Sequence, residues 1–171
     1  MKLFSWIKRR SLIKKGLKLL NNGKYKEAMK YFDKTIKIDP NHAIGWYNKG
    51  VCLINLKKYK KALTCFNKAL KLNPNLAQAW HNKGAALDDL GRYDEALECY
   101  EKSLKINPKD YKTWYNKGIT LDELKRYDEA LECYEKSLKI NPKDYKTWYN
   151  KGIVLKELKR YDEALECYEK A

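Results

Sequence analysis

The stretch that decides the fold runs from Asn107 to Pro142 and reads NPKDYKTWYNKGITLDELKRYDEALECYEKSLKINP. It begins and ends with an Asn-Pro pair, and the residues that follow repeat it. Residues 107–136 and 141–170 differ only where Thr120 becomes Val154 and Asp122 becomes Lys156. A tandem duplication of a 34-residue unit is the simplest account of this identity.

The same period extends through the rest of the chain. All the prolines lie 34 residues apart, and columns of glycine, tryptophan and alanine keep that spacing. The columns are Pro40, Pro74, Pro108 and Pro142; Gly16, Gly50, Gly84, Gly118 and Gly152; Trp46, Trp80, Trp114 and Trp148; Ala28, Ala62, Ala96, Ala130 and Ala164. Residues of such different chemistry repeating in step indicate an array of five structural units.

Each unit is predicted to be a pair of α-helices. Small and apolar residues recur at i, i+4 and i+7, the spacing that lines one face of a helix, first at Trp46, Gly50 and Leu53 and again at Ala62, Phe66 and Ala69. The turn between the helices is expected at Lys57-Lys58, where other units have Gly91-Arg92 and Asn22-Gly23. The second helix is expected to end before each proline, which disfavours helical geometry in the preceding residue.

Two features of these helices suggest a structural role. A glycine inside a helix costs about 1 kcal/mol relative to alanine, so the repeated glycine predicts a close approach of two helices. Glutamates four residues before lysines predict i, i+4 ion pairs on the solvated face of the second helices. The expected pairs are Glu98 with Lys102, Glu101 with Lys105, and Glu132 with Lys136.

These residues resemble the tetratricopeptide repeat, whose signature matches the second copy at Trp46, Gly50, Ala62, Phe66, Ala69 and Pro74. The resemblance covers about residues 9–171 and implies an all-α fold, a right-handed superhelical α-solenoid of helix-turn-helix units. One departure is a lysine in place of the usual leucine before the glycine, at Lys49, Lys83, Lys117 and Lys151.

The period divides the chain into an amino-terminal extension and five repeats. A basic and apolar extension is expected at residues 1–8, followed by a degenerate first repeat at 9–42 that has Leu12 in the tryptophan column and serves as a cap. Further repeats are expected at 43–76, 77–110 and 111–144, with an incomplete fifth at 145–171. No polar capping helix follows the fifth repeat, which suggests either a truncated chain or end-to-end self-association.

Charge is distributed unevenly along the chain. The net charge is +15, but residues 1–76 carry 19 Lys and Arg against 3 Asp and Glu, whereas residues 77–171 carry 18 against 19. Such asymmetry indicates either a basic surface for nucleic acid, an anionic membrane or an acidic protein, or a lysine-rich solubility pattern. Neither a signal-peptide core nor a membrane span is recognisable, and the odd number of cysteines fits a reducing compartment, so we expect a cytoplasmic protein.

The resemblance implies that one face of each first helix lines a concave groove that holds a peptide. An asparagine recurs there in four copies, and a carboxamide can both donate and accept hydrogen bonds to a peptide backbone. Tyrosines in the adjacent column, with His81 in one copy, and lysines at one end of two helices complete the candidates. These predicted groove residues are Asn48, Asn82, Asn116, Asn150, Tyr47, Tyr115, Tyr149, Lys112 and Lys146. An alternative is that the asparagines only bridge neighbouring repeats.

Nothing in the sequence suggests catalysis, a cofactor or a metal. Cys65, Cys99, Cys133 and Cys167 form one column and are expected to pack as small apolar residues too far apart for disulfides. The only histidines, His42 and His81, lie in no triad-like or metal-ligand pattern. The sequence therefore predicts a non-enzymatic scaffold that binds a peptide segment of an unidentified partner protein, with nucleic-acid or anionic-membrane binding through the basic first two repeats as the alternative.

Overall fold

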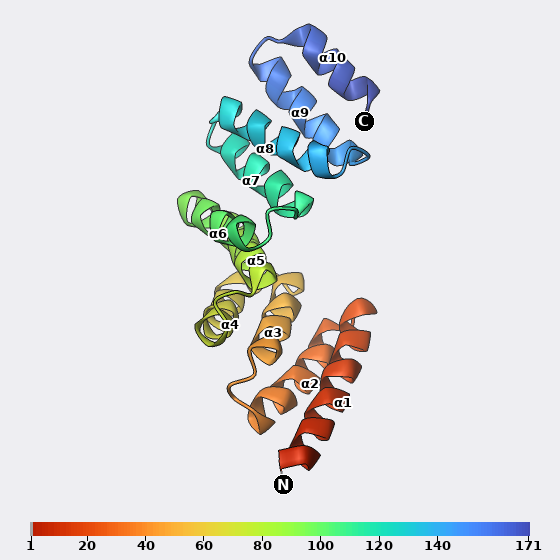
Figure 1. The fold of residues 1–171 in the computed structure, drawn as a ribbon, viewed down its shortest axis with the longest axis vertical. Helices are drawn as coiled ribbons and strands as arrows, with labels where there is room; N and C mark the ends of the chain where they lie inside the picture. Colours follow the sequence, from red (N-terminus) through yellow and green to blue (C-terminus); the bar gives the residue numbers. More distant parts are fainter. Residues whose placement is uncertain (1) are drawn as a thin grey trace. The chain divides into compact units, whose positions relative to one another are not determined.

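The computed structural model describes residues 2–171, with side chains from Trp6 onward. Within this range the chain forms ten α-helices and no strand, in two compact units that divide after Leu90 (Figure 1). The first unit holds α1 (Lys2–Asn21), α2 (Tyr25–Ile38), α3 (Ala43–Asn55), α4 (Tyr59–Leu72) and α5 (Ala77–Asp88). The second holds α6 (Tyr93–Ile106), α7 (Tyr111–Glu123), α8 (Tyr127–Ile140), α9 (Tyr145–Glu157) and α10 (Tyr161–Glu169).

Within each unit, consecutive helices pack against one another. In the first unit α1 pairs with α2 and α3 with α4, while α2 packs on α3 and α4 on α5. The second unit repeats this order, with hairpins α7–α8 and α9–α10 and with α6 packed on α7 and α8 on α9. The predicted all-α architecture of stacked helical hairpins is confirmed. α1 begins at Lys2, so residues 2–8, expected as an extension, are continuous with the first helix of the array.

The turns between helices depend on a left-handed residue. Lys57, Lys125 and Lys159 have φ of 55°, 57° and 60°, and the same column holds Gly23 and Gly91 with φ of 72° and 71°. Glycine adopts this conformation without a Cβ penalty, whereas lysine adopts it at some cost. The prediction that Lys57 belongs to the turn is confirmed.

A hydrogen bond couples the tryptophan column to the proline column. The indole nitrogen of Trp46 donates to the carbonyl of Pro40 at 2.9 Å. The same bond recurs at 2.8 to 2.9 Å in the other copies, from Trp80 to Pro74, Trp114 to Pro108 and Trp148 to Pro142. Each half-buried indole therefore stabilises the turn just before its own helix. This contact explains why tryptophan and proline recur together every 34 residues.

The repeated glycine lies under an aromatic ring of the paired helix. A Cβ placed on Gly50 would lie 2.5 Å from the ring of Phe66, and one placed on Gly118 would lie 2.5 Å from the ring of Tyr134. Real Cβ atoms do not approach so closely, so only glycine permits this crossing. The predicted close approach of the two helices is confirmed.

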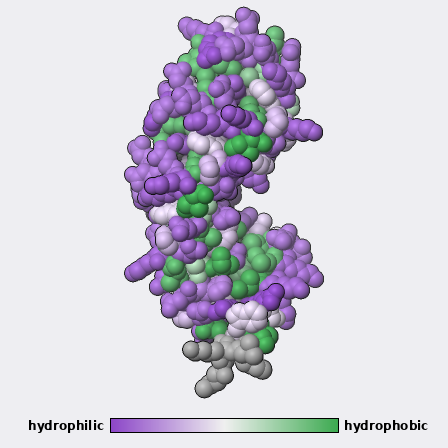
Figure 2. Space-filling view, in the orientation of Figure 1, coloured by the Kyte–Doolittle hydropathy of each residue, from purple (hydrophilic) through white to green (hydrophobic). Residues whose placement is uncertain are grey.

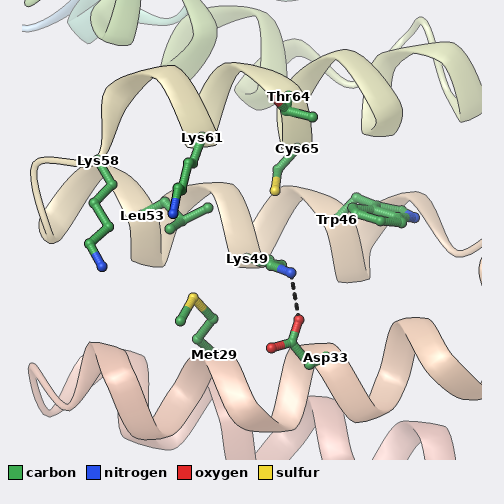
Figure 3. A pocket seen from close by; sticks show the side chains of 9 residues that line it. All are labelled: Met29, Asp33, Trp46, Lys49, Leu53, Lys58, Lys61, Thr64 and Cys65. Carbon is green, nitrogen blue, oxygen red and sulfur yellow. Dashed lines mark ion pairs between the residues drawn. The ribbon is translucent and has the colours of Figure 1, made fainter.

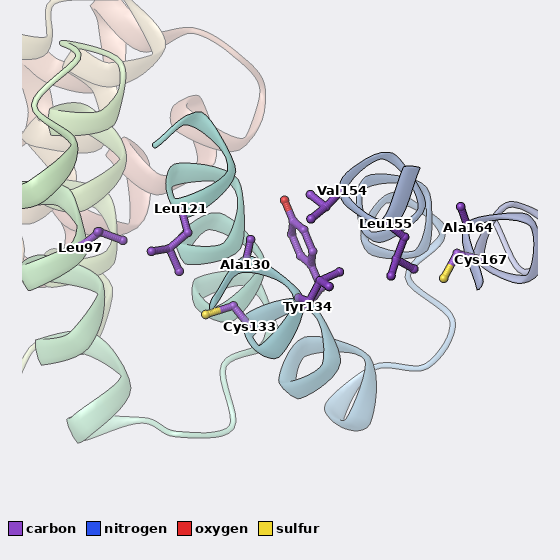
Figure 4. Close-up of a cluster of buried hydrophobic side chains, with 10 residues drawn as sticks. Leu97, Leu121, Ala130, Cys133, Tyr134, Val154, Leu155, Ala164 and Cys167 are labelled. Atoms are coloured by element: carbon purple, nitrogen blue, oxygen red, sulfur yellow. The ribbon is translucent and has the colours of Figure 1, made fainter. Parts of the chain in front are cut away.

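The core of the second unit runs through successive helices. Figure 4 shows buried leucines, alanines and cysteines that extend from Leu97 of α6 to Cys167 of α10, with Tyr134 between them. On the visible face in Figure 2, hydrophilic side chains predominate and apolar ones form smaller groups among them. This arrangement leaves the polar columns of the first helices available for other roles.

Candidate peptide-binding face

Two of the predicted groove asparagines bridge neighbouring repeats. The Asn82 side-chain nitrogen donates to the Tyr47 hydroxyl at 3.1 Å, and the Asn150 nitrogen donates to the Tyr115 hydroxyl at 3.1 Å. Asn48 is only 4% exposed. The alternative role considered for the asparagines is therefore present in the structure at Asn82 and Asn150.

The two bridging tyrosines are held in the neutral form. Burial raises the pKa of Tyr47, and the hydrogen bond from Asn82 opposes this only in part. Burial and the charge of Asp144 likewise raise the pKa of Tyr115. Each hydroxyl can therefore still donate a hydrogen bond while it accepts one from the asparagine.

The remaining candidates in the second unit are more accessible. Asn116 on α7 is half-buried, and Tyr149 on α9 is 54% exposed with its ring 5.9 Å from that of Tyr168. Lys112 and Lys146 are exposed at the starts of α7 and α9, each near the ring of the tyrosine before it. A polar amide, an aromatic ring and two ammonium groups are thus available on these two helices.

The opposite end of α7 is acidic, with Asp122 and Glu123, whereas α9 ends with Lys156 and Glu157. Burial, followed by the charges of Glu123 and Glu157, raises the pKa of Asp122. These three carboxylates belong to the last turns of α7 and α9. The charge therefore runs from positive to negative along α7, with Glu157 of α9 adding a further carboxylate, which suits a ligand with separated charges.

Sequence reasoning missed the role of the unusual lysine column. Lys117 pairs with Glu101 at 2.9 Å and Lys151 with Glu135 at 2.9 Å, each from a first helix to the second helix of the preceding repeat. Lys49 pairs with Asp33 at 2.7 Å in the same way. The acids at a constant distance of 16 residues before these lysines could have revealed the pattern.

These contacts correct one predicted ion pair. Within the described residues, Glu101 contacts Lys117 and not Lys105, because the lysine of the following helix lies closer than the lysine one turn along. The pair of Glu132 with Lys136 does form, at a distance of 3.9 Å. The outer face therefore carries bonds between repeats as well as pairs within a helix.

A basic hollow of about 370 Å³ lies in the first unit among α2, α3 and α4, and we call it the α2–α4 pocket (Figure 3). A second hollow of about 390 Å³ adjoins the start of α4 and is lined by residues 57–61 and Leu90. Lys58 and Lys61 line both hollows. The α2–α4 pocket is lined by Met29, Asp33, Trp46, Lys49, Leu53, Lys58, Lys61, Thr64 and Cys65.

The cysteines are buried free thiols, as predicted for the cysteine column. Burial raises the pKa of Cys52 and of Cys133 to about 11, so both are unreactive thiols at neutral pH. Among residues 2–171, no cluster of His, Cys, Asp or Glu could hold a metal ion. None of the described helices has the length and apolar character needed to cross a membrane.

Comparison with known proteins agrees with this geometry. The profile of the tetratricopeptide repeat family matches residues 10–42, 43–76, 77–110, 111–144 and 145–171. The chain belongs to the tetratricopeptide repeat family. A search among curated proteins finds no match.

Several solved structures share the fold of this tetratricopeptide repeat protein. A MamA fragment from Desulfovibrio magneticus RS-1 is 27% identical, with a TM-score of 0.86 over 95% of this chain and 92% of that one. PilF from Pseudomonas aeruginosa is 24% identical, with a TM-score of 0.89 over 97% of this chain and 76% of that one. YrrB, described as a TPR protein with an unusual peptide-binding site, is 23% identical, with a TM-score of 0.76 over 93% and 82%.

Proposed function

We propose that this protein is a non-catalytic scaffold that binds a peptide segment of a partner protein on the first-helix face of its repeats. In the second unit the site would comprise Asn116, Tyr149, Lys112 and Lys146 on α7 and α9. The observation that carries the proposal is the separation of charge along α7, with the accessible Lys112 at its start and the carboxylates of Asp122 and Glu123 at its end. Lys146 and Glu157 add one charge of each sign at the two ends of α9. A peptide with separated charges would complement both ends.

The bridging asparagines support this site indirectly. Asn150 uses one N–H on Tyr115, which leaves its second N–H and its carbonyl oxygen with bonding capacity. The bridge also holds α9 in register with α7, so the side chains facing the ligand are preorganised. Family membership agrees with a protein or peptide partner, and the structural relative YrrB is described as having a peptide-binding site.

The test is a binding comparison on a partner isolated with the intact protein. Replacing Asn116 and Asn150 together with alanine should weaken the partner's affinity about tenfold, because hydrogen bonds to the peptide backbone are lost. Asn67→Ala is the control, since it removes an exposed amide from α4, a second helix outside the proposed face, and leaves α7 and α9 intact. Unchanged affinity in the double variant, with native helicity by circular dichroism, would rule out this face.

A second candidate function is binding of nucleic acid or an anionic membrane through the basic first two repeats. The observation in its favour is that residues 40–87 contain eight lysines and no aspartate or glutamate. Phosphate contacts release counterions, so such binding should fall steeply with salt. A salt titration with an oligonucleotide and flotation with anionic liposomes test this function, and two negative results would dismiss it.

A further inference from the structure

The second and fourth repeats have the same number of basic side chains but differ in the number of acidic ones. Residues 43–76 carry seven lysines and no carboxylate, whereas residues 111–144 carry seven basic and seven acidic side chains. The two segments belong to the same family and fold into the same pair of helices. The fold therefore does not require the acids to be absent, and their loss from one repeat needs another explanation.

An ion pair that recurs in the other repeats lacks its acidic partner in the second repeat. At the start of the second helix of three repeats, an arginine grips a glutamate three residues later through two nitrogens, as in Arg126 with Glu129 at 2.7 Å. The same pair forms between Arg92 and Glu95 and between Arg160 and Glu163. The second repeat has Lys58 and Lys61 at these two positions, and in the described part of the chain no carboxylate pairs with either.

The two lysines meet at the α2–α4 pocket. Figure 3 shows Lys58 extending toward the space above α2, while Lys61 extends from α4 and ends beside Leu53 of α3. Lys49 lies deeper and is already neutralised by Asp33 at 2.7 Å. With three lysines and one aspartate among its lining residues, the pocket carries a net charge of +2.

The pocket also has an apolar part. Met29, Leu53 and Trp46 line it beside the ammonium groups. A phosphate backbone would leave these apolar side chains uncovered. A carboxylate flanked by an apolar side chain would satisfy both parts of the pocket.

We propose that the α2–α4 pocket is a docking site for an acidic segment of a partner protein. A carboxylate of that segment enters between Lys58 and Lys61, where the glutamate of the other repeats is missing. A neighbouring apolar side chain of the same segment covers Met29 and Leu53. This site is separate from the face of α7 and α9 and is formed by the first two repeats alone.

The equivalent positions in the second unit differ in charge, which explains why only the first unit would bind an acidic segment. The equivalent positions on α6, α7 and α8 carry two cations, Lys117 and Arg126, against three carboxylates, Glu101, Glu129 and Glu132. Two of these carboxylates already form ion pairs with the two cations, at 2.9 Å and 2.7 Å. An acidic ligand would be repelled there, so the chain contains its own non-binding counterpart.

The test restores the ion pair of the other repeats. The double variant Lys58→Arg and Lys61→Glu should fold at least as stably as the wild type, because the arginine–glutamate pair is the arrangement of the third, fourth and fifth repeats. Lys68→Glu is the matched control, because it makes the same change in net charge on the exposed face of α4, two turns along the helix from Lys61 and outside the lining of the pocket. Lys61→Gln is a milder variant that keeps the test valid if the double variant fails to fold.

The probe is a fluorescein-labelled peptide in which glutamates alternate with leucines, followed by fluorescence anisotropy with the full chain. We expect the wild type to bind it, the double variant to lose at least about tenfold in affinity, and Lys68→Glu to lose less than about twofold. A peptide with glutamine in place of glutamate should not bind. Asn116→Ala should leave this binding unchanged, which separates the pocket from the proposed groove.

Three results would overturn the proposal. The first is that the wild type does not bind the acidic peptide. The second is an equal loss in Lys68→Glu and in the double variant, which would indicate a diffuse basic surface. The third is tighter binding of an oligothymidylate or of phosphatidylserine vesicles than of the peptide, with no selective effect of the double variant.

Discussion

At the scale of single residues, the Tyr134 hydroxyl is conspicuous because it is buried without a hydrogen-bond partner. Its ring packs on Gly118, and Figure 4 shows the hydroxyl beside Val154, a member of the same buried cluster. Val154 replaces the threonine found one repeat earlier at Thr120, so the position facing this tyrosine lost its hydroxyl in the last copy. An unpaired buried hydroxyl costs free energy because it has left water without compensation.

Tyr134→Phe should therefore stabilise the protein by about 1 kcal/mol. Phenylalanine already occupies this column at Phe32 and Phe66, so the ring is accommodated without repacking. Urea denaturation followed by circular dichroism measures the change. Tyr168→Phe, in the same column but nearer the solvent, should show no such gain, and a loss of stability in Tyr134→Phe would contradict the explanation.

The buried thiols give a prediction about pH. Burial raises the pKa of Cys52 and Cys133 to about 11 in the folded chain, above the ordinary range of about 8 to 9 that they recover on unfolding. The native state thus prefers the neutral thiol, so this stabilisation is complete below the unfolded pKa and is lost as pH rises toward about 11. Reaction with a disulfide reagent at pH near 8 should be slow in buffer and fast in urea, whereas fast reaction of the native protein would contradict it.

At the scale of helices, the first turn of α4 carries positive side chains, which are unfavourable at the positive end of a helix dipole. α6, α8 and α10 have Asp-Glu in the first turn, where carboxylates stabilise the positive end of a helix, but α4 has Lys60 and Lys61. Replacing Lys60 with aspartate and Lys61 with glutamate should raise the free energy of unfolding by about 1 kcal/mol or more. Thermal unfolding at low salt measures it. Lys68→Glu in the middle of α4 is the control and should give no comparable gain.

Elements were easier to predict than contacts between them. The prolines, the glycines and the turn at Lys57 follow from the conformational limits of each residue, so the 34-residue period was enough to place the helical hairpins. The partner of Glu101 could not be found in this way. Spacing along one helix favoured Lys105, whereas stacking of hairpins brought Lys117 to 2.9 Å. For the same reason sequence alone left open whether Asn82 and Asn150 face a ligand or a neighbouring tyrosine.

At the scale of the whole molecule, the two compact units differ in charge. Residues 1–90 carry 20 Lys and Arg against 5 Asp and Glu, whereas residues 91–171 carry 17 of each. The α2–α4 pocket lies in the first and the proposed face of α7 and α9 in the second. The two proposed binding sites therefore sit in different electrostatic environments.

This difference predicts that salt affects the two binding events unequally. Raising the ionic strength from about 0.05 to about 0.5 M shortens the Debye length below 10 Å, which screens the net positive field that attracts an acidic peptide to the first unit. Affinity for that peptide should fall several-fold. Binding on the second unit should fall less, because that unit has no net charge and its ligand is held by a few local charges together with amide contacts. Parallel titrations of the two ligands measure both slopes. The variant Lys58→Arg with Lys61→Glu should weaken the salt dependence of acidic-peptide binding and leave that of the second ligand unchanged. Equal salt dependence of both ligands in the wild type would contradict the prediction, because the net charge of each unit would then not govern its ligand affinity.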